Sequence, residues 1–345
     1  MQAVIATWIY LDSAEESSAY PQVGSRSHLP VFQMVYWQCV AVFYALSVRH
    51  NPDARHLLFT NQTPEQLPVQ DGFNWPEHLA KLNVEVVTLP LTWQTPPGYF
   101  GRWRNQFYIF DILQFFEKQV YNDNTPLLVF DSDCLINRPL EPLFEAVRQH
   151  GLMTLRIPYQ AEDNINGITL SDMRQLYTEL SGDDPGVDPT YFGGEVFAAT
   201  PATVRQINAL APAVWDDMMQ RHRTERPKFN EEAHFLSYCY HQIGHFGDMS
   251  PFLKRIWTAF HYENVVASDV NLPIWHLPSE KTGGIALLFI RLRQGKPLPA
   301  DPVTLGGLVG VPKRTAYLNW KHFLKYTALY RWFTKLKLQT SRYAF

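Results

Sequence analysis

Two aspartates, Asp131 and Asp133, directly follow an apolar run in the stretch PLLVFDSDCLINRP, residues 126–139. Residues two apart in an extended chain point to the same side, so both carboxylates can face one cation. Carboxylate oxygens are ligands that Mg²⁺ and Mn²⁺ prefer, and these ions commonly share their coordination with substrate phosphates. The apolar run predicts a buried strand that holds both carboxylates at its carboxyl end. We therefore expect a divalent-cation site here.

Two other uses of an Asp-x-Asp pair can be compared with the letters around it. A calcium-binding EF-hand loop would need an acid or amide at Leu135 and glycine at Ile136, so that motif is excluded. A haloacid-dehalogenase-type phosphatase also places Asp-x-Asp after an apolar strand, with Asp131 as the nucleophile. Its usual hydroxyl residue is missing near Cys134 or Leu135, and its motif normally opens the domain. The phosphatase alternative is less favoured but stays open.

A glycine pair and two arginines also stand at positions that suit a ligand. Gly193 and Gly194 let the backbone approach a bound molecule closely, although a β-bulge would explain the pair as well. Arg102 and Arg104 flank Trp103 where a helix is expected to begin, and the helix dipole disfavours cations there. We therefore favour an anion-facing role for these arginines, with Arg104 as the preferred candidate.

Two glutamates open another predicted helix, in the stretch FNEEAH. Asn230 suits the N-cap position, and Glu231 and Glu232 would occupy the first turn, where the helix dipole stabilises acids. That stabilisation alone explains both residues. The alternative is that the carboxylates contact a substrate, and the residues by themselves leave this choice open.

The elements that must position these residues alternate between strands and helices. Apolar runs bounded by turn residues predict strands at 3–10, 56–61, 84–90, 126–133 and 151–159, with helices at 33–49, 103–120 and 140–149. Such alternation, with nearly continuous apolar strands, is typical of a parallel sheet covered by helices on both faces. Ligands of such sheets bind outside the carboxyl ends of the strands, which is where Asp131 and Asp133 are expected.

The second half of the chain has a mixed pattern. It predicts a strand at 194–200 and helices at 171–181, 202–222 and from the FNEEAH stretch onward. A polar loop is expected at 11–30, after the first strand, and a Gly- and Pro-rich linker at 294–313. The fold class is therefore α/β, with a Rossmann-like, mostly parallel sheet.

The composition excludes several classes of protein. The 345 residues are 46% hydrophobic and carry a net charge of −3, so they can bury a large core and have no overall attraction to nucleic acid. The three cysteines are widely spaced and predict neither a disulfide framework nor a zinc site. The N-terminus is typical of a first strand rather than a signal peptide, and no stretch approaches the ~20 apolar residues of a membrane span. We therefore expect a cytoplasmic protein.

The last segment of the chain, residues 311–345, differs from the rest in charge. It carries eight lysines and arginines and no acid, so its charge is +8 and that of the remaining chain is −11. It is also rich in aromatic residues and has a helical pattern. A basic, aromatic helix of this kind fits the surface of an anionic membrane, which predicts contact with the cytoplasmic face of a membrane. The alternative is that the aromatic residues pack on the main body and the lysines are simply solvated.

A series of stretches falls in the order in which one known fold carries its motifs. They are VIAT, NPDARHLLFTN, GRWRNQFYIFDILQFF, PLLVFDSDCLINRPLEPLF, YFGGEVFAATPATV, VWDDMMQRHRTERPKFNEEAHFLSYCYH and WHLPSEK. Together they resemble the motifs of metal-dependent nucleotide-sugar glycosyltransferases of the GT-A fold, over residues 3–285. The sixth stretch is similar to a region of glycosyltransferase family 6, and WHLPSEK is similar to a motif of family 8. Both families retain the anomeric configuration of the sugar.

The resemblance implies a GT-A catalytic domain at 1–310, followed by the basic helix at 311–345. Residues 1–160 would be the nucleotide-binding half, and residues 161–310 the half for donor sugar and acceptor. The implied activity is transfer of a hexose or N-acetylhexosamine from a UDP-sugar to a hydroxyl of a glycan or glycolipid, with Mn²⁺ or Mg²⁺ and with retention. An inverting enzyme with Glu232 as general base stays open.

The resemblance also implies roles for individual residues. Asp131, Asp133 and His276 would bind the metal, which together with nearby cations would stabilise the departing diphosphate. Glu232 would be the catalytic carboxylate near the anomeric carbon, stabilising oxocarbenium-like charge or acting as a nucleophile. The other implied contacts are Ala6 and Thr7 to the nucleobase, Arg104, Asp131 and Lys281 to the nucleotide, Gly193, Gly194 and Glu195 to the donor sugar, and Glu231, His234 and Trp215 to the acceptor.

Two function classes other than a glycosyltransferase stay open at this point. One is the phosphatase or phosphotransferase with Asp131 as nucleophile, which trapping of a phospho-aspartate would favour. The other is a non-catalytic sugar- or lipid-binding protein on a transferase scaffold. Binding of a nucleotide without hydrolysis or transfer of a donor would favour the latter.

Overall fold

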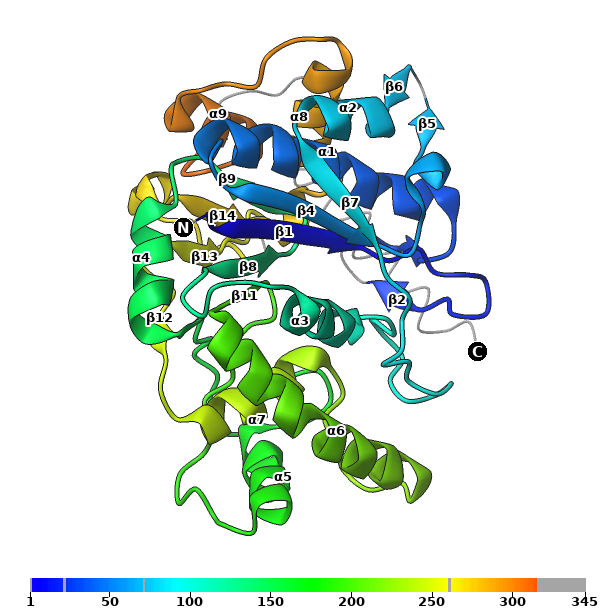
Figure 1. Cartoon of the computed structure of the whole chain (residues 1–345), viewed down its shortest axis with the longest axis vertical. Coiled ribbons are helices and arrows are strands. Elements are labelled where there is room, and N and C mark those ends of the chain that lie inside the picture. The colour runs from blue at the N-terminus through cyan, green and yellow to red at the C-terminus, as the bar shows by residue number, and fades with distance from the viewer. Residues whose placement is uncertain (1, 21–22, 71, 260–261, 315–345) are drawn as a thin grey trace.

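A seven-stranded sheet runs through the middle of the computed structural model, which describes residues 2–20, 23–70, 72–259 and 262–314 (Figure 1). In spatial order the strands are β12 (Gly247–Asp248), β10 (Leu152–Thr154), β11 (Val196–Ala199), β8 (Leu127–Phe130), β1 (Val4–Ile9), β4 (Arg55–Thr60) and β7 (Val84–Thr88). Strand β11 is antiparallel to both of its neighbours, and the other neighbouring pairs are parallel. The predicted α/β class with a mostly parallel sheet is confirmed.

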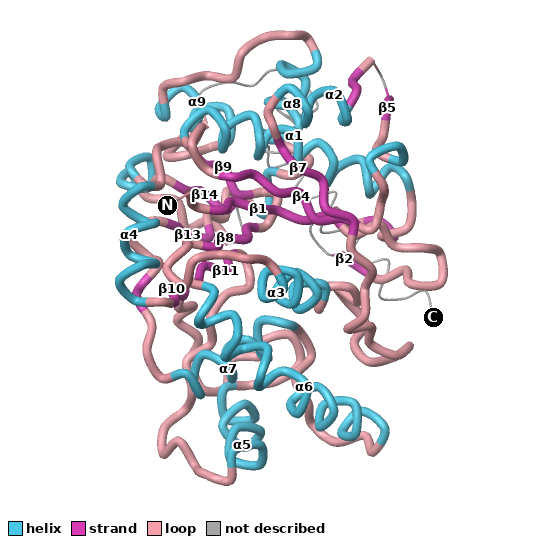
Figure 2. The backbone as a smooth tube through the Cα atoms, in the orientation of Figure 1, coloured by secondary structure: helices cyan, strands magenta, loops and turns pink. Residues whose placement is uncertain are grey.

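Helices cover both faces of this sheet, as the sequence predicts (Figures 1 and 2). One face carries α1 (Pro30–His50), α2 (Trp75–Lys81), α8 (Gly284–Arg293) and α9 (Pro302–Val309). The other carries α3 (Tyr108–Lys118), α5 (Leu170–Ser181), α6 (Pro201–Arg223) and α7 (Glu232–Ile243). Helix α4 (Glu141–His150) flanks the edge of the sheet at β10 and β12.

The alternation of side chains along the strands explains these two layers. In β1, Ile5 packs in the apolar cluster that contains α1, whereas Val4 and Ala6 pack in the cluster that contains α3. Leu128 and Leu127 of β8 divide between the two clusters in the same way. Successive side chains of a strand point to opposite faces, so a strand buried on both sides must be apolar throughout. The apolar run before Asp131 is such a strand.

A three-stranded sheet lies beside the central one and positions part of the site. Its strands, in spatial order, are β13 (Leu253–Arg255), β14 (Ile274–His276) and β9 (Cys134–Ile136), with β14 parallel to β13 and antiparallel to β9. The remaining elements are small: the hairpins β2 (Ala19–Tyr20) with β3 (Ser25–Arg26) and β5 (Val69–Gln70) with β6 (Phe73–Asn74), and 3₁₀ turns at Pro64–Gln66, Ala267–Asn271 and Pro278–Glu280.

The sequence predicts most of the larger elements within a few residues, but two helix starts are wrong. The helix expected from residue 103 begins at Tyr108, so Arg102 and Arg104 precede it rather than begin it. The N-cap position of α7 is occupied by Glu231, not by Asn230. The Asn230 side chain instead donates to the carbonyl oxygen of Asn166, 3.0 Å away, so a tertiary contact replaces the expected cap.

The linker expected at 294–313 is also wrong, because α9 lies within it. Asp301 caps this helix by accepting a hydrogen bond from the Thr304 amide at 2.8 Å, and Pro302 suits its first turn. Leu305, Val309 and Val311 are buried in the core. Glycines in this stretch permit close packing rather than mark a flexible connection, since a Cβ at Gly306 would overlap the backbone of Val311.

Helix α1 corrects the expectation that no stretch is apolar enough for a membrane span. Among the described residues it is long and apolar enough by length and composition, and 56% of its most apolar window is buried. It packs on β1, β9 and α8, inside the apolar cluster of its face of the sheet. A helix that covers the middle of a sheet needs the same apolar character as one that lies in lipid.

The basic aromatic segment expected to form a helix at 311–345 lies outside the described residues from 315 onward. Its first part is fixed to the body of the protein. Val311 is buried, and Arg314 pairs with the buried carboxylate of Glu280 at 2.6 Å. The segment therefore departs from a point next to the loop that carries Lys281.

Candidate functional site

A cavity of about 860 Å³ opens at the carboxyl ends of β1 and β8. Its lining comes from both halves of the chain: the segment after β1, the loop before α3, the end of β8, the glycine pair before β11, the start of α7, and the ends of β13 and β14. Asp131 lines it directly, with 38% of its side chain exposed, whereas Asp133 is 1% exposed and lies behind. The position agrees with the rule that open α/β sheets bind ligands outside their carboxyl strand ends.

Strand pairing brings the predicted metal ligands together. The Asp-x-Asp stretch turns between β8 and β9, with the Cys134 amide donating to the Asp131 carbonyl at 3.0 Å. Strand β14 pairs with β9 so that His276 stands opposite Cys134. The imidazole is therefore next to Asp133 although more than 140 residues separate them in sequence.

The three side chains form a cluster that could hold a metal ion. One ligand atom each from Asp131, Asp133 and His276 lie within 4.8 Å of one another. His276 Nε2 is 3.5 Å from Asp131 Oδ2 and 3.3 Å from Asp133 Oδ2, while its Nδ1 faces Glu195 Oε1 at 3.6 Å. A carboxylate behind the second ring nitrogen is the usual device for orienting a metal-binding histidine. Two carboxylates and one imidazole suit Mn²⁺ well and leave positions for other oxygen ligands.

Charges around this cluster alter the ionisation of its members. Burial and the neighbouring Asp133 raise the pKa of Asp131 to about 6. Burial also opposes ionisation of Asp133, but Lys281 and His276 outweigh it and hold the Asp133 pKa below its ordinary value. Burial would lower the pKa of His276, yet Asp133 and Glu195 raise it to about 9. Without a metal the cluster therefore relies on its own protons and cations to balance the carboxylates.

Lys281, expected to contact the diphosphate, lines the cavity but is paired with Asp133. Its ammonium contacts Asp133 Oδ2 and lies 5.7 Å from the ring centroid of Tyr36. Both side chains of the pair are at least 93% buried.

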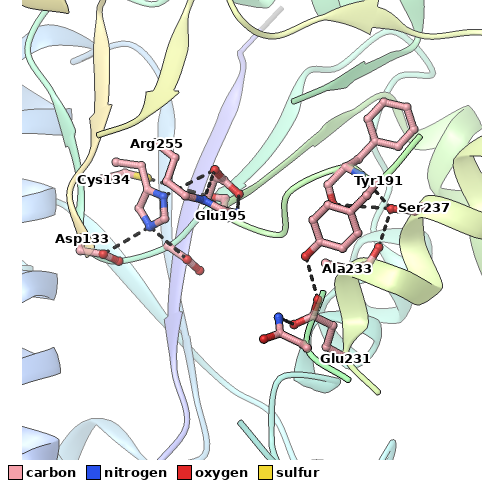
Figure 3. Close-up of polar contacts among 12 residues, drawn as sticks. Asp133, Cys134, Tyr191, Glu195, Glu231, Ala233, Ser237 and Arg255 are labelled. Atoms are coloured by element: carbon pink, nitrogen blue, oxygen red, sulfur yellow. Dashed lines mark hydrogen bonds and ion pairs between the residues drawn. The ribbon is translucent and has the colours of Figure 1, made fainter. Parts of the chain in front are cut away.

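Glu195, expected to contact the donor sugar, is bound by an arginine that the sequence did not single out. Its carboxylate accepts two hydrogen bonds from Arg255, one of them from Nε at 2.9 Å (Figure 3). Arg255 is placed there because β13 pairs with β14 in parallel and sets Arg255 beside His276. The arginine and the adjacent His276 hold the pKa of Glu195 below its ordinary value against the effect of burial. Glu195 thus lies between Arg255 and His276, the histidine predicted to bind the metal.

Gly193 and Gly194, predicted to allow close approach of a ligand, lie against two of the protein's own carboxylates. A Cβ at Gly193 would overlap the Glu195 carboxylate and lie 2.8 Å from Arg255 Nη2. A Cβ at Gly194 would overlap the Glu232 carboxylate. The glycine pair therefore lets the backbone lie between the two carboxylates, and Gly194 lines the cavity there.

Glu231 and Glu232 both line the cavity at the start of α7, but their surroundings differ. Glu231 accepts hydrogen bonds from the Tyr191 hydroxyl at 2.7 Å and from Asn166 Nδ2 at 2.6 Å (Figure 3). Glu232 has one carboxylate oxygen, Oε2, that is buried without a hydrogen-bond partner. Burial, together with the charges of Glu231 and Asp131, raises the pKa of Glu232 well above its ordinary value.

His234 and Trp215, the weaker acceptor candidates, lie away from the cavity lining. His234 is fully buried, with Nε2 3.6 Å from Glu231 Oε1. Burial lowers its pKa. Trp215 packs edge-on against Trp93 and Phe107. His234 can therefore act only through Glu231, and Trp215 has the surroundings of a packing residue.

The residues expected at the nucleotide are displaced from the cavity by a few positions. Ala6 and Thr7 are fully buried inside β1, and the Thr7 hydroxyl donates to the Phe130 carbonyl at 2.7 Å. The cavity is lined instead by the stretch 8–12, which follows them. Arg104 is not part of the lining: its guanidinium donates to the carbonyl oxygens of Glu15 and Thr95. Its neighbour Arg102 lines the cavity.

Sequence reasoning missed an aromatic part of the lining. Tyr20, Phe32 and Tyr36 lie side by side, with ring centroids 5.0 Å apart for Tyr20–Phe32 and for Phe32–Tyr36. Trp103, between the two arginines, lines the cavity with a φ of 46°, which is rare for a bulky side chain. Tyr20 lies in the stretch assigned to a polar loop, and Phe32 and Tyr36 follow in a helix whose apolar residues looked uniform. The unusual backbone angle of Trp103 is the feature that marks this part of the lining, and such an angle cannot be read from a single sequence.

Comparisons with known proteins give structural similarity but no sequence match. No protein-family model matches the chain, and no curated protein shows significant similarity to it. Similar solved structures include apo GlyE, a glycosyltransferase of Streptococcus pneumoniae TIGR4, with 13% identity, a TM-score of 0.40, and coverage of 80% of this chain and 54% of that one. The galactosyltransferase LgtC with donor and acceptor sugar analogs has 13% identity, a TM-score of 0.42, and coverage of 92% of this chain and 99% of that one. Mouse xyloside xylosyltransferase 1 in its apo form has 11% identity, a TM-score of 0.43, and coverage of 80% of this chain and 97% of that one. The chain thus spans about half the length of GlyE.

All three proteins are glycosyltransferases, the class that the sequence motifs resemble. Similarity at this level assigns no activity to the chain, so its chemistry has to be argued from the residues of the cavity.

Proposed function

We propose that this chain is a metal-dependent glycosyltransferase that moves a hexosyl group from a UDP-sugar to a hydroxyl acceptor. One observation carries the proposal: a single cavity joins the Asp131, Asp133 and His276 cluster to the carboxylate of Glu232. Glycosyl transfer needs cations where the diphosphate leaves and a carboxylate where the sugar becomes electron-poor. The two ends of this cavity meet those opposite requirements.

At the first end, Asp131, Asp133 and His276 would hold Mn²⁺ or Mg²⁺. An ion bound there would supply Lewis-acid stabilisation of the departing diphosphate. Glu195 Oε1 lies 3.6 Å from His276 Nδ1, where its charge would favour the ring orientation that turns Nε2 toward the ion, and Arg255 pairs with Glu195. Lys281 adds a second cation at the cavity wall.

At the second end, Gly194 and Glu232 would face the donor sugar. The absence of a side chain at Gly194 lets the Glu232 carboxylate lie against the backbone at the cavity wall, next to the position proposed for the sugar. An ionised Glu232 could stabilise oxocarbenium-like charge or attack the anomeric carbon, and retention is proposed because both resembled families retain the anomeric configuration. Use of Glu232 as a general base would give inversion instead. NMR of the product's anomeric proton distinguishes these outcomes.

The aromatic residues Tyr20, Phe32 and Tyr36 suit the nucleobase in place of Ala6 and Thr7. Planar rings favour stacking of a base, and Tyr36 stands next to the Lys281 ammonium. A base stacked there would place its diphosphate toward Lys281 and the metal ligands. This arrangement supports a nucleoside diphosphate as the leaving group.

The acceptor is proposed to be a glycan or glycolipid. Glu231 is held in place by Tyr191 and Asn166, so it presents a fixed carboxylate for hydrogen bonds from sugar hydroxyls. The charge of +8 over residues 311–345 supports contact with the anionic, cytoplasmic face of a membrane, where a glycolipid would be found.

Calorimetric titration of UDP, with and without Mn²⁺, tests the proposal. Wild type is expected to bind UDP only in the presence of Mn²⁺, and Asp133→Asn is expected to abolish that binding. Asp269→Asn is the matched control, because Asp269 is also a buried carboxylate paired with a lysine, Lys254 at 2.9 Å, outside the cavity. The control should bind as wild type does.

Failure of wild type to bind UDP, GDP and CDP under either condition would overturn the glycosyltransferase proposal. Trapping of a phosphoryl group on Asp131 would then support the phosphatase class. Metal-dependent binding of a UDP-sugar that is neither hydrolysed nor transferred to any acceptor would instead support a non-catalytic binding protein.

A further inference from the structure

The ammonium of Lys281 lies where it interferes with a metal ion. It contacts Asp133 Oδ2, the same oxygen that His276 Nε2 approaches at 3.3 Å. A metal bound by His276 Nε2 and Asp133 would lie beside this oxygen. Lys281 and such an ion would therefore share this one oxygen of Asp133.

Burial makes this overlap important. The Asp133 side chain is 1% exposed and that of Lys281 is 7% exposed, so little water screens their charges. A buried carboxylate without a cation is costly, and Lys281 supplies that cation when no metal is present. A divalent ion and an ammonium on one buried oxygen would repel each other strongly. The two cations are thus alternatives for Asp133.

Lys281 can leave Asp133 without leaving the site. Its side chain is a flexible four-carbon chain with a compact charge, and it already lines the cavity. Movement away from Asp133 would bring the ammonium into the cavity, where a diphosphate would provide a new anionic partner. An anion in the cavity would therefore draw Lys281 from Asp133 and open that carboxylate to the metal.

We infer that Lys281 is a tethered counter-ion that competes with the divalent ion for Asp133, and that a diphosphate relieves this competition. The inference rests on the proposed function, because it assumes the metal and nucleotide sites. The inference predicts that the metal binds weakly in the absence of UDP and that UDP raises the affinity of the protein for the metal. By thermodynamic linkage, the metal must strengthen UDP binding by the same factor.

Binding of Mn²⁺ alone, measured from the EPR signal of free Mn²⁺, tests the competition directly. Lys281→Met is expected to bind Mn²⁺ more tightly than wild type, by about 5- to 150-fold, the usual range of coupling between sites. Lys281→Arg keeps a cation at Asp133 and should not show this gain. Lys254→Met removes a lysine from the Lys254–Asp269 pair and should match wild type. In Lys281→Met, UDP should raise Mn²⁺ affinity less than it does in wild type.

A lysine that only contacts the diphosphate would give another result. Lys281→Met would then lower the affinity for UDP, and the affinity for Mn²⁺ in the absence of UDP would be unchanged or lower. That result would overturn the competition and leave the metal site intact. If no protein binds Mn²⁺, with or without UDP, the proposed metal site itself fails. Should the Met variant not fold, wild type still decides, because UDP that leaves Mn²⁺ affinity unchanged contradicts the inference.

Discussion

The cavity contains two groups of carboxylates that are balanced in opposite ways (Figure 3). At the β8 end, Asp133 pairs with the buried Lys281, and Glu195 pairs with Arg255, whose side chain is 22% exposed. At the start of α7, Glu231 is held by the neutral donors Tyr191 and Asn166, and one oxygen of Glu232 has no hydrogen-bond partner. Asp133 and Glu195 therefore have pKa values below their ordinary range, whereas the pKa is raised for Glu232 and also for Asp131 at the β8 end.

The difference indicates a division of labour. Carboxylates fixed by cations stay ionised and hold their geometry, which suits metal binding and orientation of His276. A carboxylate in a buried site without a cation gains most when positive charge develops next to it. Under the proposed function, the first group would serve binding and the second the chemical step, and variants at each end should separate the two.

The largest effect is expected from Glu232→Gln, which removes the ionisable group while keeping its shape. We expect turnover to fall by about 10²- to 10⁴-fold, the usual contribution of one positioned catalytic group. Binding of UDP with Mn²⁺ should be unchanged, because the β8 end is intact. Glu231→Gln is the matched neighbour and should mainly raise the KM for the acceptor. Steady-state kinetics with a UDP-sugar would check both, and equal losses in the two variants would contradict the division.

Glu195→Gln should instead weaken the fold and the metal site. The substitution leaves Arg255 without its carboxylate, and breaking a buried ion pair typically costs about 3–5 kcal/mol of unfolding free energy. It also removes the anion behind His276 Nδ1. Urea denaturation and Mn²⁺ titration measure the two effects. A stable variant with normal Mn²⁺ affinity would show that Glu195 does not support the cluster.

In the metal-free protein, the cation-paired Asp133 and Glu195 should respond to pH with the opposite sign to Glu232. The depressed pKa values of Asp133 and Glu195 contribute stability above their ordinary values of 3.8 and 4.5, which is lost as pH falls through the folded values. The raised pKa of Glu232 favours folding below 4.5, and this contribution is lost as pH rises. Glu232→Gln should therefore become more stable relative to wild type as pH increases above 4.5. Thermal melts across pH measure this. A difference in melting temperature between Glu232→Gln and wild type that stays constant as pH rises above 4.5 would contradict a raised pKa of Glu232.

The smallest effect is expected from Tyr191→Phe, which removes one neutral donor from Glu231. A lost hydrogen bond to a buried charged group costs about 1.5–3 kcal/mol, less than a broken buried ion pair. Asn166 remains as the second donor, so Glu231 should keep its position. If Tyr191→Phe lost as much unfolding free energy as Glu195→Gln in the same urea denaturation assay, the proposed difference between the two ends would be contradicted.

The sequence predicts the fold well where a pattern repeats. Apolar runs locate β1, β4, β7 and β8, and the Asp-x-Asp position follows from the end of β8. These inferences succeed because burial on both faces of a sheet imposes a continuous apolar strand. His276 was identified only through the resemblance of WHLPSEK to a known motif.

The remaining site residues depend on features that single sequences do not encode visibly. Arg255 reaches the site through pairing of three-residue strands, β13 with β14, which are too short to show a period. Ala6 and Thr7 were chosen because the VIAT stretch resembles the opening strand of a known fold, but both are buried inside β1 and the lining begins only at Trp8. The anion-facing role of Arg102 and Arg104 was inferred from a helix start expected at residue 103, whereas the helix begins five residues later, at Tyr108. An error of a few residues in the position of an element changes which side chains are expected to line the cavity.

The glycine pair at 193–194 also limits how this cavity can vary among related sequences. Any side chain at Gly193 or Gly194 would displace Glu195 or Glu232, so even a substitution to alanine would disturb these carboxylates. Altered donor preference would have to arise at other parts of the wall, such as Tyr159, Asn164 or Trp257, which line the cavity without that constraint. A mutagenesis library intended to change the sugar should therefore spare the glycines and diversify those three positions.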